Sequence, residues 1–338
     1  MHARPAFLIT IDTEGDNVWS RQASVETRNA EFLPRFQELS ERFGFKPTYL
    51  TNNEMARSAA FQELARASLA KGTAEIGMHL HAWDSPPLVP LTEADSRHHP
   101  YLVDYPVAVM RDKISQMTDL LEDTFCAPMR SHRAGRWAFN ETYAKLLVDR
   151  GYRIDCSVTP GHSWGATPGA PGTSGTDYTG FPDLPYFVDL EDIGHAGASQ
   201  LLEVPVTIRS SWLKRKWPAA YRGPLRRVAK RVVPELQWLR PDGTNLANML
   251  SLVDWSVRTR RPCLEFMIHS SELMPGGSPY FVTGPSIERL YDDLEALFNR
   301  ISACFCGNTL SEFYTAWVDT AAGIRHGSNR SDTAAGSS

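Results

Sequence analysis

The chain of 338 residues has few cysteines, no long apolar run and little net charge, and each absence excludes a class of protein. Its five cysteines are an odd number without the spacing of a disulfide framework, so we expect reduced thiols in a cytosolic protein. No segment is apolar over the length that spans a bilayer, and we expect no signal peptide before the first strand. The formal net charge of −4 argues against a general nucleic-acid binder.

Segments with the apolar spacing of strands and of helices alternate through most of the chain, which predicts parallel βαβ units in one α/β domain over residues 1–322. Strands are expected at 7–11, 46–51, 74–81, 128–133, 152–158, 201–208 and 262–269. Helices are expected at 25–43, 58–71, 105–125, 140–150, 245–259, 286–300 and 309–318. Pro34 falls inside the first helix, so its regular part is expected to begin there. Residues 323–338, rich in Ser, Gly and Ala, are expected to form a disordered tail.

Two insertions, 160–200 and 209–240, interrupt this alternation. Within the first, residues 160–180 contain six glycines and three prolines, which predicts a mobile loop and a candidate lid. The second contains ten Lys or Arg, one acid, three tryptophans and a tyrosine. Apolar residues between the cations indicate a short amphipathic helix with a basic face, which is typical of segments that lie on anionic membranes. A solvated charged surface is the alternative.

Titratable side chains gather where the predicted strands end. Asp12 and Glu14 follow the first strand, and His79 and His81 lie at the end of the third, so each pair shares one face. Paired acids at a buried strand end are costly unless they bind a metal or transfer protons. The alternative is a turn in which Asp12 and Asp16 accept hydrogen bonds from nearby backbone N–H groups. Two histidines and a carboxylate are a standard ligand set for a hydrolytic metal. The alternative is that each histidine only forms hydrogen bonds in the core.

Five short motifs occur in one order along the chain: Thr-Ile-Asp12-Thr-Glu14-Gly, Glu-Ile-Gly-Met-His79, Arg133-Ala-Gly-Arg-Trp137, Asp155-Cys-Ser157 and Ile268-His269-Ser. Together they resemble the motifs of the polysaccharide deacetylases, the NodB-homology or family 4 carbohydrate esterases. The resemblance implies a distorted, partial (β/α)7 barrel and removal of an N-acyl or O-acyl group from a sugar. It also implies a divalent metal, usually Zn²⁺, with Co, Ni or Mn as alternatives. A His-Ser-Ser-Glu-Leu stretch from His269 is similar to members from surface-polysaccharide or O-antigen biosynthesis.

The resemblance implies a role for each charged residue at a strand end. Asp12 matches the catalytic base, and Arg133 matches the arginine that keeps this base ionised. Asp155 matches an acid in the groove wall. His269 matches the histidine that protonates the leaving group.

The expected metal ligands are Glu14, His79 and His81. In the family the second metal histidine follows the first by four residues, and this chain has Trp83 at that position. We therefore expect His81 to replace it, with Asp84 as the alternative. Three residues are expected to line the sugar site: Trp83, Arg136 and Trp137.

The expected activity is metal-dependent removal of a sugar N-acyl group, and acetyl is the expected acyl group. The same framework leaves open a sugar deformylase or an allantoinase-like amide hydrolase. A saccharide-binding relative without activity is a further alternative, which Trp83 at a ligand position favours. We expect an acylated saccharide as the partner, carried on a lipid pyrophosphate at the inner membrane surface, where residues 209–240 would make peripheral contact. No nucleic-acid partner is expected.

Overall fold

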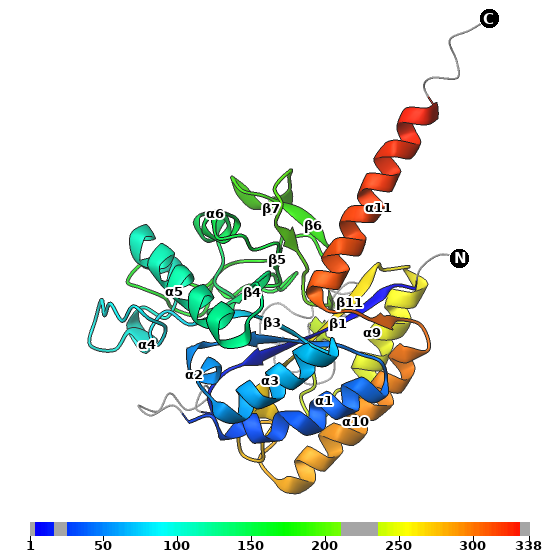
Figure 1. Cartoon of the computed structure of the whole chain (residues 1–338), viewed down its shortest axis with the longest axis horizontal. Coiled ribbons are helices and arrows are strands. Elements are labelled where there is room, and N and C mark those ends of the chain that lie inside the picture. Colours follow the sequence, from blue (N-terminus) through cyan, green and yellow to red (C-terminus); the bar gives the residue numbers. More distant parts are fainter. Residues whose placement is uncertain (1–3, 17–25, 211–235, 332–338) are drawn as a thin grey trace, which may run out of the picture.

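The computed structural model of the chain describes residues 4–16, 26–210 and 236–331. A curled sheet lies at its centre, and helices pack around the outside (Figure 1). In spatial order the strands are β11 (Cys263–His269), β1 (Ala6–Thr13), β2 (Pro47–Thr51), β3 (Glu75–Leu80), β4 (Ser131–Ala134), β5 (Ile154–Asp155), β8 (Leu202–Glu203), β6 (Tyr186–Asp189) and β7 (Asp192–Ala196), while β12 (Cys306–Gly307) also pairs with β1. The sheet forms a distorted half-barrel, so the predicted α/β fold class is confirmed.

The helices begin and end at residues that carry recognisable signals. They are α1 (Leu33–Arg42), α2 (Asn53–Ala56), α3 (Ala59–Lys71), α4 (Asp95–His98), α5 (Val107–Phe125), α6 (Glu141–Asp149), α9 (Leu246–Arg258), α10 (Gly284–Ser302) and α11 (Leu310–Ser331), with 3-10 turns at Arg28–Phe32, Leu102–Asp104, Gly135–Trp137 and Ser270–Leu273. Pro34 lies in the first turn of α1, as expected. The side chain of Asn140 accepts a hydrogen bond from the Tyr143 N–H and so caps α6.

Strands β1 and β11 lie side by side and form the buried part of the sheet that carries the site. Every residue of both strands is buried, which suits parallel strands covered on both faces. Their register pairs Asp12 with His269, and the register of β3 and β4 pairs His79 with Arg133. Because parallel strands end at one edge of the sheet, these four side chains meet there.

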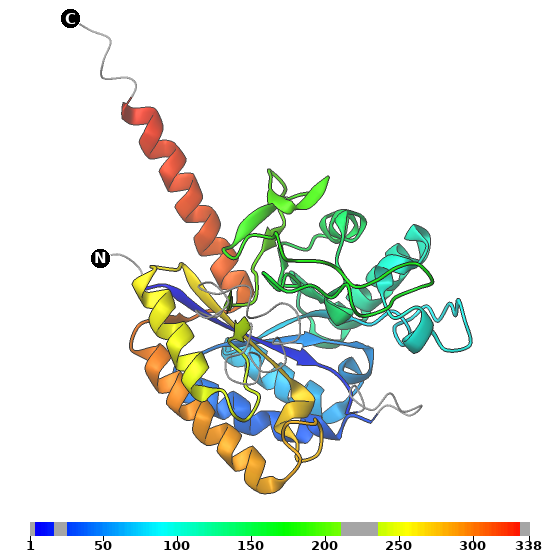
Figure 2. The ribbon, with the colours of Figure 1, turned by 180° about the vertical axis from the view of Figure 1, so that it is seen from behind.

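The first insertion contains a hairpin that the sequence pattern does not predict. Strands β6 and β7 pair antiparallel, and β6 also pairs antiparallel with β8, so the sheet is mixed (Figure 2). These strands are only four and five residues long, and segments this short carry little periodic signal. The fifth predicted strand, 152–158, shortens to the two residues of β5.

The loop at residues 160–180 is held in place by hydrogen bonds. The Asp104 carboxylate accepts from the Ala170 N–H at 2.9 Å and from the Thr173 hydroxyl at 3.1 Å. The Tyr101 hydroxyl donates to the Thr167 carbonyl at 3.2 Å. The loop is therefore docked on the segment before α5, and its opening as a lid stays a prediction.

The last described element of the chain is a helix. Helix α11 is assigned from Leu310 to Ser331 and projects away from the sheet (Figure 1), and the domain boundary at residue 322 stays a prediction. No proline interrupts this stretch, and helix propagation needs only one further hydrogen bond per residue. Residues 332–338 lie outside the described residues. Among the described helices, none is long and apolar enough to cross a membrane.

The second insertion is described only at its two ends. Strands β9 (Ile208–Ser210) and β10 (Leu236–Trp238) pair antiparallel. Residues 211–235, which carry most of the predicted basic helix, lie outside the described residues. Membrane contact by this segment therefore stays a prediction.

Candidate metal and catalytic site

Glu14, His79 and His81 come together at the carboxyl ends of β1 and β3. Oε2 of Glu14 lies 2.8 Å from Nε2 of His81 and 3.5 Å from Nε2 of His79. The two imidazole Nε2 atoms lie 3.0 Å apart. Ligand atoms at about 2.1 Å from one ion lie about 3 Å from each other when their bonds are near 90° apart. The three side chains therefore have the spacing of a metal-ligand set, and all three are buried.

Hydrogen bonding around the three ligands also fits a metal. The Nδ1–H of His79 can donate to the Arg133 carbonyl at 2.9 Å, which leaves its Nε2 lone pair directed at Glu14 and His81. Oε1 of Glu14 and Nδ1 of His81 are buried without a hydrogen bond. Buried polar atoms without partners are costly, and a bound ion offsets that cost for a carboxylate. The residues present fit a divalent cation.

The charges of this cluster are strongly coupled. Burial would raise the pKa of Glu14, but hydrogen bonds from His79 and His81 leave it well below its usual range. Burial would lower the pKa of His79, but the carboxylates of Asp12 and Glu14 raise it to about 9. Burial lowers the pKa of His81. A metal ion must therefore displace a proton from His79, and metal affinity should fall at low pH.

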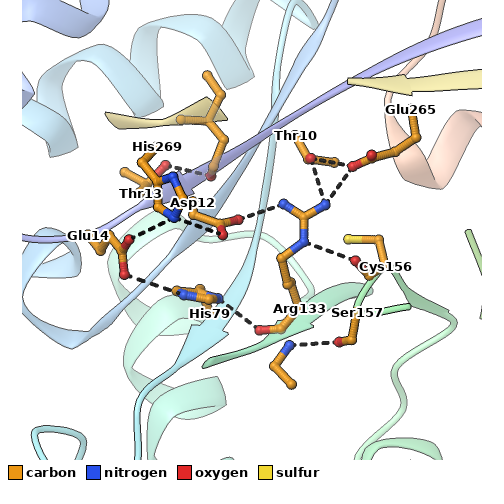
Figure 3. Close-up of polar contacts among 12 residues, drawn as sticks. Thr10, Asp12, Thr13, Glu14, His79, Arg133, Cys156, Ser157, Glu265 and His269 are labelled. Atoms are coloured by element: carbon orange, nitrogen blue, oxygen red, sulfur yellow. Dashed lines mark hydrogen bonds and ion pairs between the residues drawn. The ribbon is translucent and has the colours of Figure 1, made fainter. Parts of the chain in front are cut away.

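Asp12 lies beside the metal-ligand set and is held by Arg133 (Figure 3). Nη1 of Arg133 donates to Oδ1 of Asp12 at 2.6 Å, while Nη2 donates to Thr10 and to Glu265 at 2.8 and 2.5 Å. The guanidinium is fully buried, and its Nε donates to the Cys156 carbonyl at 2.9 Å. Burial would raise the pKa of Asp12, but the positive charge of Arg133, followed by those of His79 and His269, holds it below its usual value. Asp12 is therefore an ionised carboxylate, as a base must be.

His269 faces the same carboxylates from the end of β11 (Figure 3). Its Nε2 lies 3.5 Å from Oε1 of Glu14 and 3.8 Å from Oδ2 of Asp12. On its other side, Nδ1 lies 3.3 Å from Oε2 of Glu272 and 3.0 Å from Nη2 of Arg240. Arg240 and Glu272 also form an ion pair at 2.9 Å.

Neither Arg240 nor Glu272 was assigned a role from the sequence. The signal for Glu272 was its place three residues after His269, where it can bond back to the strand end. It does so, because its Oε2 accepts from the His269 N–H at 2.9 Å. Arg240 carried no separate signal, because it stands at the end of a run of cations.

Of the three predicted sugar-site residues, Trp83 contacts a metal ligand, Arg136 lies over Trp83, and Trp137 lies beside Arg133. Trp83 packs edge-on against His81 with ring centroids 4.4 Å apart, and the Arg136 guanidinium lies 5.0 Å above the Trp83 ring. The Arg133 guanidinium lies 4.8 Å from the Trp137 ring. Arg136 and Trp137 have φ of 54° and 61°, the left-handed region that such residues rarely adopt. Strain of this kind gathers at functional sites, where the surrounding structure holds it.

The structure corrects the expectation for Asp155. Its side chain is fully buried, so it cannot line a groove. Oδ1 of Asp155 faces Nδ1 of His132 at 2.6 Å and accepts from the Ser157 hydroxyl at 3.0 Å. The Ser157 hydroxyl in turn accepts from the Ala134 N–H at 2.8 Å. Asp155 thus holds the end of β4, next to Arg133, rather than the substrate.

The remaining sequence alternative for the metal set was Asp84. Among the described residues, the group with metal-ligand spacing contains Glu14, His79 and His81 and not Asp84. Burial and the nearby carboxylates of Glu54 and Glu14 raise the pKa of Asp84 well above its usual range. The spacing of the side chains therefore favours His81 over Asp84 as the third ligand.

Comparisons with solved structures agree with this geometry at the level of the fold. A protein from Parabacteroides distasonis, described as a glycoside hydrolase/deacetylase, is 9% identical to this chain. The two structures match with a TM-score of 0.59 over 93% of this chain and 71% of that protein. A protein assigned as a polysaccharide deacetylase from Mycobacterium smegmatis is 15% identical, with a TM-score of 0.50 over 93% of both chains. The chain has the deacetylase-type fold.

The same fold also occurs in a protein with a different activity. A 4-alpha-glucanotransferase from Thermococcus litoralis is 14% identical, with a TM-score of 0.52 over 93% of this chain, which spans only 40% of that protein. No family model and no curated protein matches the sequence. The deacetylase-type fold by itself therefore leaves the chemistry to be argued from the site.

Proposed function

We propose that the chain is a metal-dependent hydrolase that removes an N-acyl group, in the first instance acetyl, from a sugar. One observation carries the proposal: the ligand set of Glu14, His79 and His81 lies beside a carboxylate, Asp12, that a buried arginine keeps ionised. A metal site with an adjacent base is what hydrolysis of an unactivated amide requires. The deacetylase-type fold supports the choice of a sugar amide as the substrate.

Glu14, His79 and His81 would hold the metal, for which we propose zinc. When bound, it would act as a Lewis acid on the acyl oxygen and lower the pKa of water. Asp12 accepts the proton of the attacking water, because Arg133 keeps this carboxylate charged. Water adds to the acyl carbon and the C–N bond then breaks.

The departing amine needs a proton, and His269 is placed to donate it. Its Nε2 lies on the side of Asp12 and Glu14, which face the acyl group in this arrangement. Glu272 and Arg240 contact Nδ1 from behind and hold the orientation of the ring. The products are a carboxylic acid and a sugar amine.

We further propose that the substrate belongs to surface-polysaccharide biosynthesis and is carried on a lipid at the cytoplasmic face of the membrane. The support comes from the sequence: the His269-Ser-Ser-Glu272-Leu stretch and the basic, Trp-containing segment at residues 209–240. Cations near an anionic membrane surface contribute roughly 1 kcal/mol each to binding.

Metal analysis together with an acyl-release assay tests the proposed activity. The purified protein should contain about one divalent ion per chain and should release acetate from N-acetylated saccharides. Formate release from N-formyl sugars without acetate release would favour the deformylase alternative. Protein without metal and without either product would favour a saccharide-binding function and would overturn the proposal.

A further inference from the structure

A cavity of about 630 Å³ lies at the opposite end of the sheet from the catalytic residues. It forms where β12 pairs with the first residues of β1, and its walls also come from the end of α9 and the start of α11. The start of α11 and the N-terminal end of β1 lie on the same side of the molecule in both views (Figures 1 and 2). Ala6 lines the cavity and Asp12 belongs to the catalytic site, so about 20 Å of strand β1 separates the two. The proposed reaction does not use this cavity.

Part of the cavity wall is apolar and aromatic. Trp317 packs on Phe313 with ring centroids 5.6 Å apart, and both side chains line the cavity. Val257, Pro262 and Ala316 continue this wall. Cavities of about 300–1,000 Å³ that are mostly apolar and carry a few polar groups typically bind small organic molecules.

The polar part of the wall has an excess of positive charge. Arg4, Arg260 and Arg261 line the cavity, and the described residues that line it include no acid. Arg261 is paired with Asp183 at 3.1 Å. The Arg4 guanidinium donates to the Ser302 carbonyl, and no acid among the described residues forms an ion pair with Arg4 or Arg260. Two guanidinium groups therefore remain to be matched by an anion.

The undescribed residues next to the cavity add no negative charge. Residues 1–3, which adjoin Arg4, contain no acid. The first acid after α11 is Asp332, and the helix from Thr320 to Ser331 already measures about 16 Å. The excess positive charge therefore belongs to the cavity.

Arg260 has a backbone conformation that is unusual for arginine. It ends α9 in a Schellman turn, in which its N–H donates to the Val257 carbonyl at 3.2 Å and the Arg261 N–H donates to the Ser256 carbonyl at 3.0 Å. Its φ is 52°, in the left-handed region, where glycine is the usual residue. A cation at the C-terminus of a helix is favoured by the helix dipole, which accounts for Arg260 alone. The dipole does not account for Arg4, which reaches the same cavity from the start of the chain.

We propose that this cavity binds an organic phosphate with an aromatic or alkyl body. Arg4 and Arg260 hold the phosphate, because guanidinium groups pair with its oxygens and two of them match its double charge. They lie on neighbouring chains, since the β1–β11 register pairs Ala6 with Cys263, two and three residues after them. Trp317 covers the apolar body. The site goes beyond the proposed function and does not depend on it.

Isothermal titration calorimetry of the metal-loaded full chain tests the proposal with phenyl phosphate, octyl phosphate, inorganic phosphate and benzyl alcohol. One organic phosphate should bind at least ten-fold more tightly than inorganic phosphate and benzyl alcohol, and its identity tells whether the body is aromatic or alkyl. Arg260→Gly and Trp317→Ala should each weaken this binding about ten-fold, because each removes a contact with the ligand. Arg289→Gln is the matched control, since Arg289 is an exposed cation of α10 that does not line the cavity.

Two further measurements separate the cavity from the catalytic metal and from the helix end. Glu14→Ala should lose the metal, which also attracts phosphate, but should keep the binding of the organic phosphate. Arg260→Gly should unfold at a temperature no lower than the wild type, because glycine suits the left-handed position. A lower unfolding temperature would assign Arg260 to the helix end and overturn the proposal. Equal binding of organic and inorganic phosphate, binding lost in Glu14→Ala, binding unchanged in Arg260→Gly, or no binding would each overturn it as well.

Discussion

His81 directs its Nε2 at Oε2 of Glu14, 2.8 Å away, although the two residues follow different strands. This contact places His81, rather than Trp83, in the metal-ligand set. Trp83 lies behind it and packs edge-on against the His81 ring. A histidine two residues after His79 can do this because alternate residues of an extended segment point to the same face.

Replacing His81 should remove the metal. His81→Ala takes away one of three ligands, so we expect the metal content of the purified protein to fall below about a tenth of the wild-type value, because even loss of a group that only orients a ligand costs about 10–100-fold in affinity. Trp83→Ala is the control, because it changes the neighbouring ring and leaves Glu14, His79 and His81 in place. Inductively coupled plasma mass spectrometry measures both. Normal metal content in His81→Ala would show that the ligand set is wrong.

Asp12→Asn tests the base. The amide oxygen can still accept the hydrogen bond from Arg133, so the site should keep its shape and its metal. Turnover should fall about 100-fold or more, because an amide cannot take the proton of water. Asp254→Asn makes the same change at a surface ion pair with Arg300 and should leave acyl release unaltered. Turnover near the wild-type rate in Asp12→Asn would remove Asp12 from the mechanism.

Arg133 should matter for stability as well as for activity. Its side chain is fully buried between Asp12 and Glu265, so Arg133→Met leaves two buried acids without their cation. We expect the free energy of unfolding to fall by about 3–5 kcal/mol, the usual cost of breaking a buried ion pair from one side. Arg35→Met is the matched control, since Arg35 and Glu288 are 49% and 64% exposed. That variant should lose about 1 kcal/mol or less. Urea unfolding of both proteins measures the difference, and equal losses would contradict the prediction.

Much of the site follows from local sequence because parallel strands end at one edge of the sheet. Residues such as Asp12 and His269 stand at the ends of strong apolar runs, so their meeting could be predicted without knowing how the strands pair. The partners of Arg133 could not. Thr10 and Glu265 look like ordinary members of buried strands, and only the β1–β11 pairing brings them to the guanidinium.

The errors have equally local causes. Asp155 lies at the end of a strand, as the catalytic residues do, but its side chain faces His132 in the core. The strand has only two residues, and a segment this short has no sequence pattern that predicts which of its faces is buried. In the sequence, Arg240 is one of the cations of residues 209–240 and has no distinguishing feature. Its contacts with His269 and Glu272 form only in the folded chain. Side-chain contacts that form only through tertiary packing produce no periodic pattern in the sequence.

Because of the buried carboxylate of Glu272, the free energy of unfolding should fall at acidic pH. Burial would raise its pKa, but the charge of Arg240 and the hydrogen bonds with His269 lower it from 4.5 to about 2. A lowered folded-state pKa stabilises the protein above pH 4.5, and this contribution is lost as the pH falls towards 2.

The variant Glu272→Gln lacks this titration. Between about pH 5 and pH 3, wild-type protein should lose about 2 kcal/mol more unfolding free energy than Glu272→Gln. Glu191→Gln, at a carboxylate that is 82% exposed, should follow the wild-type curve. Urea titrations at the two pH values give the difference, and parallel curves for wild type and Glu272→Gln would show that the ion pair does not set the pKa of this carboxyl.

Gly135 should be essential for the loop that carries Arg136 and Trp137. A Cβ at this position would clash with the backbone carbonyl oxygen of Leu80, and backbone cannot move aside as a flexible side chain can. Gly135→Ala should therefore push β4 away from β3, lower the free energy of unfolding by about 1–3 kcal/mol and reduce acyl release, because Arg133 lies two residues before it. Gly284→Ala is the matched control, since a Cβ there meets nothing within 4 Å. Thermal unfolding and acyl release are measured for both variants. Equal values for Gly135→Ala and Gly284→Ala would show that the loop is not positioned by the close packing of β4 on Leu80.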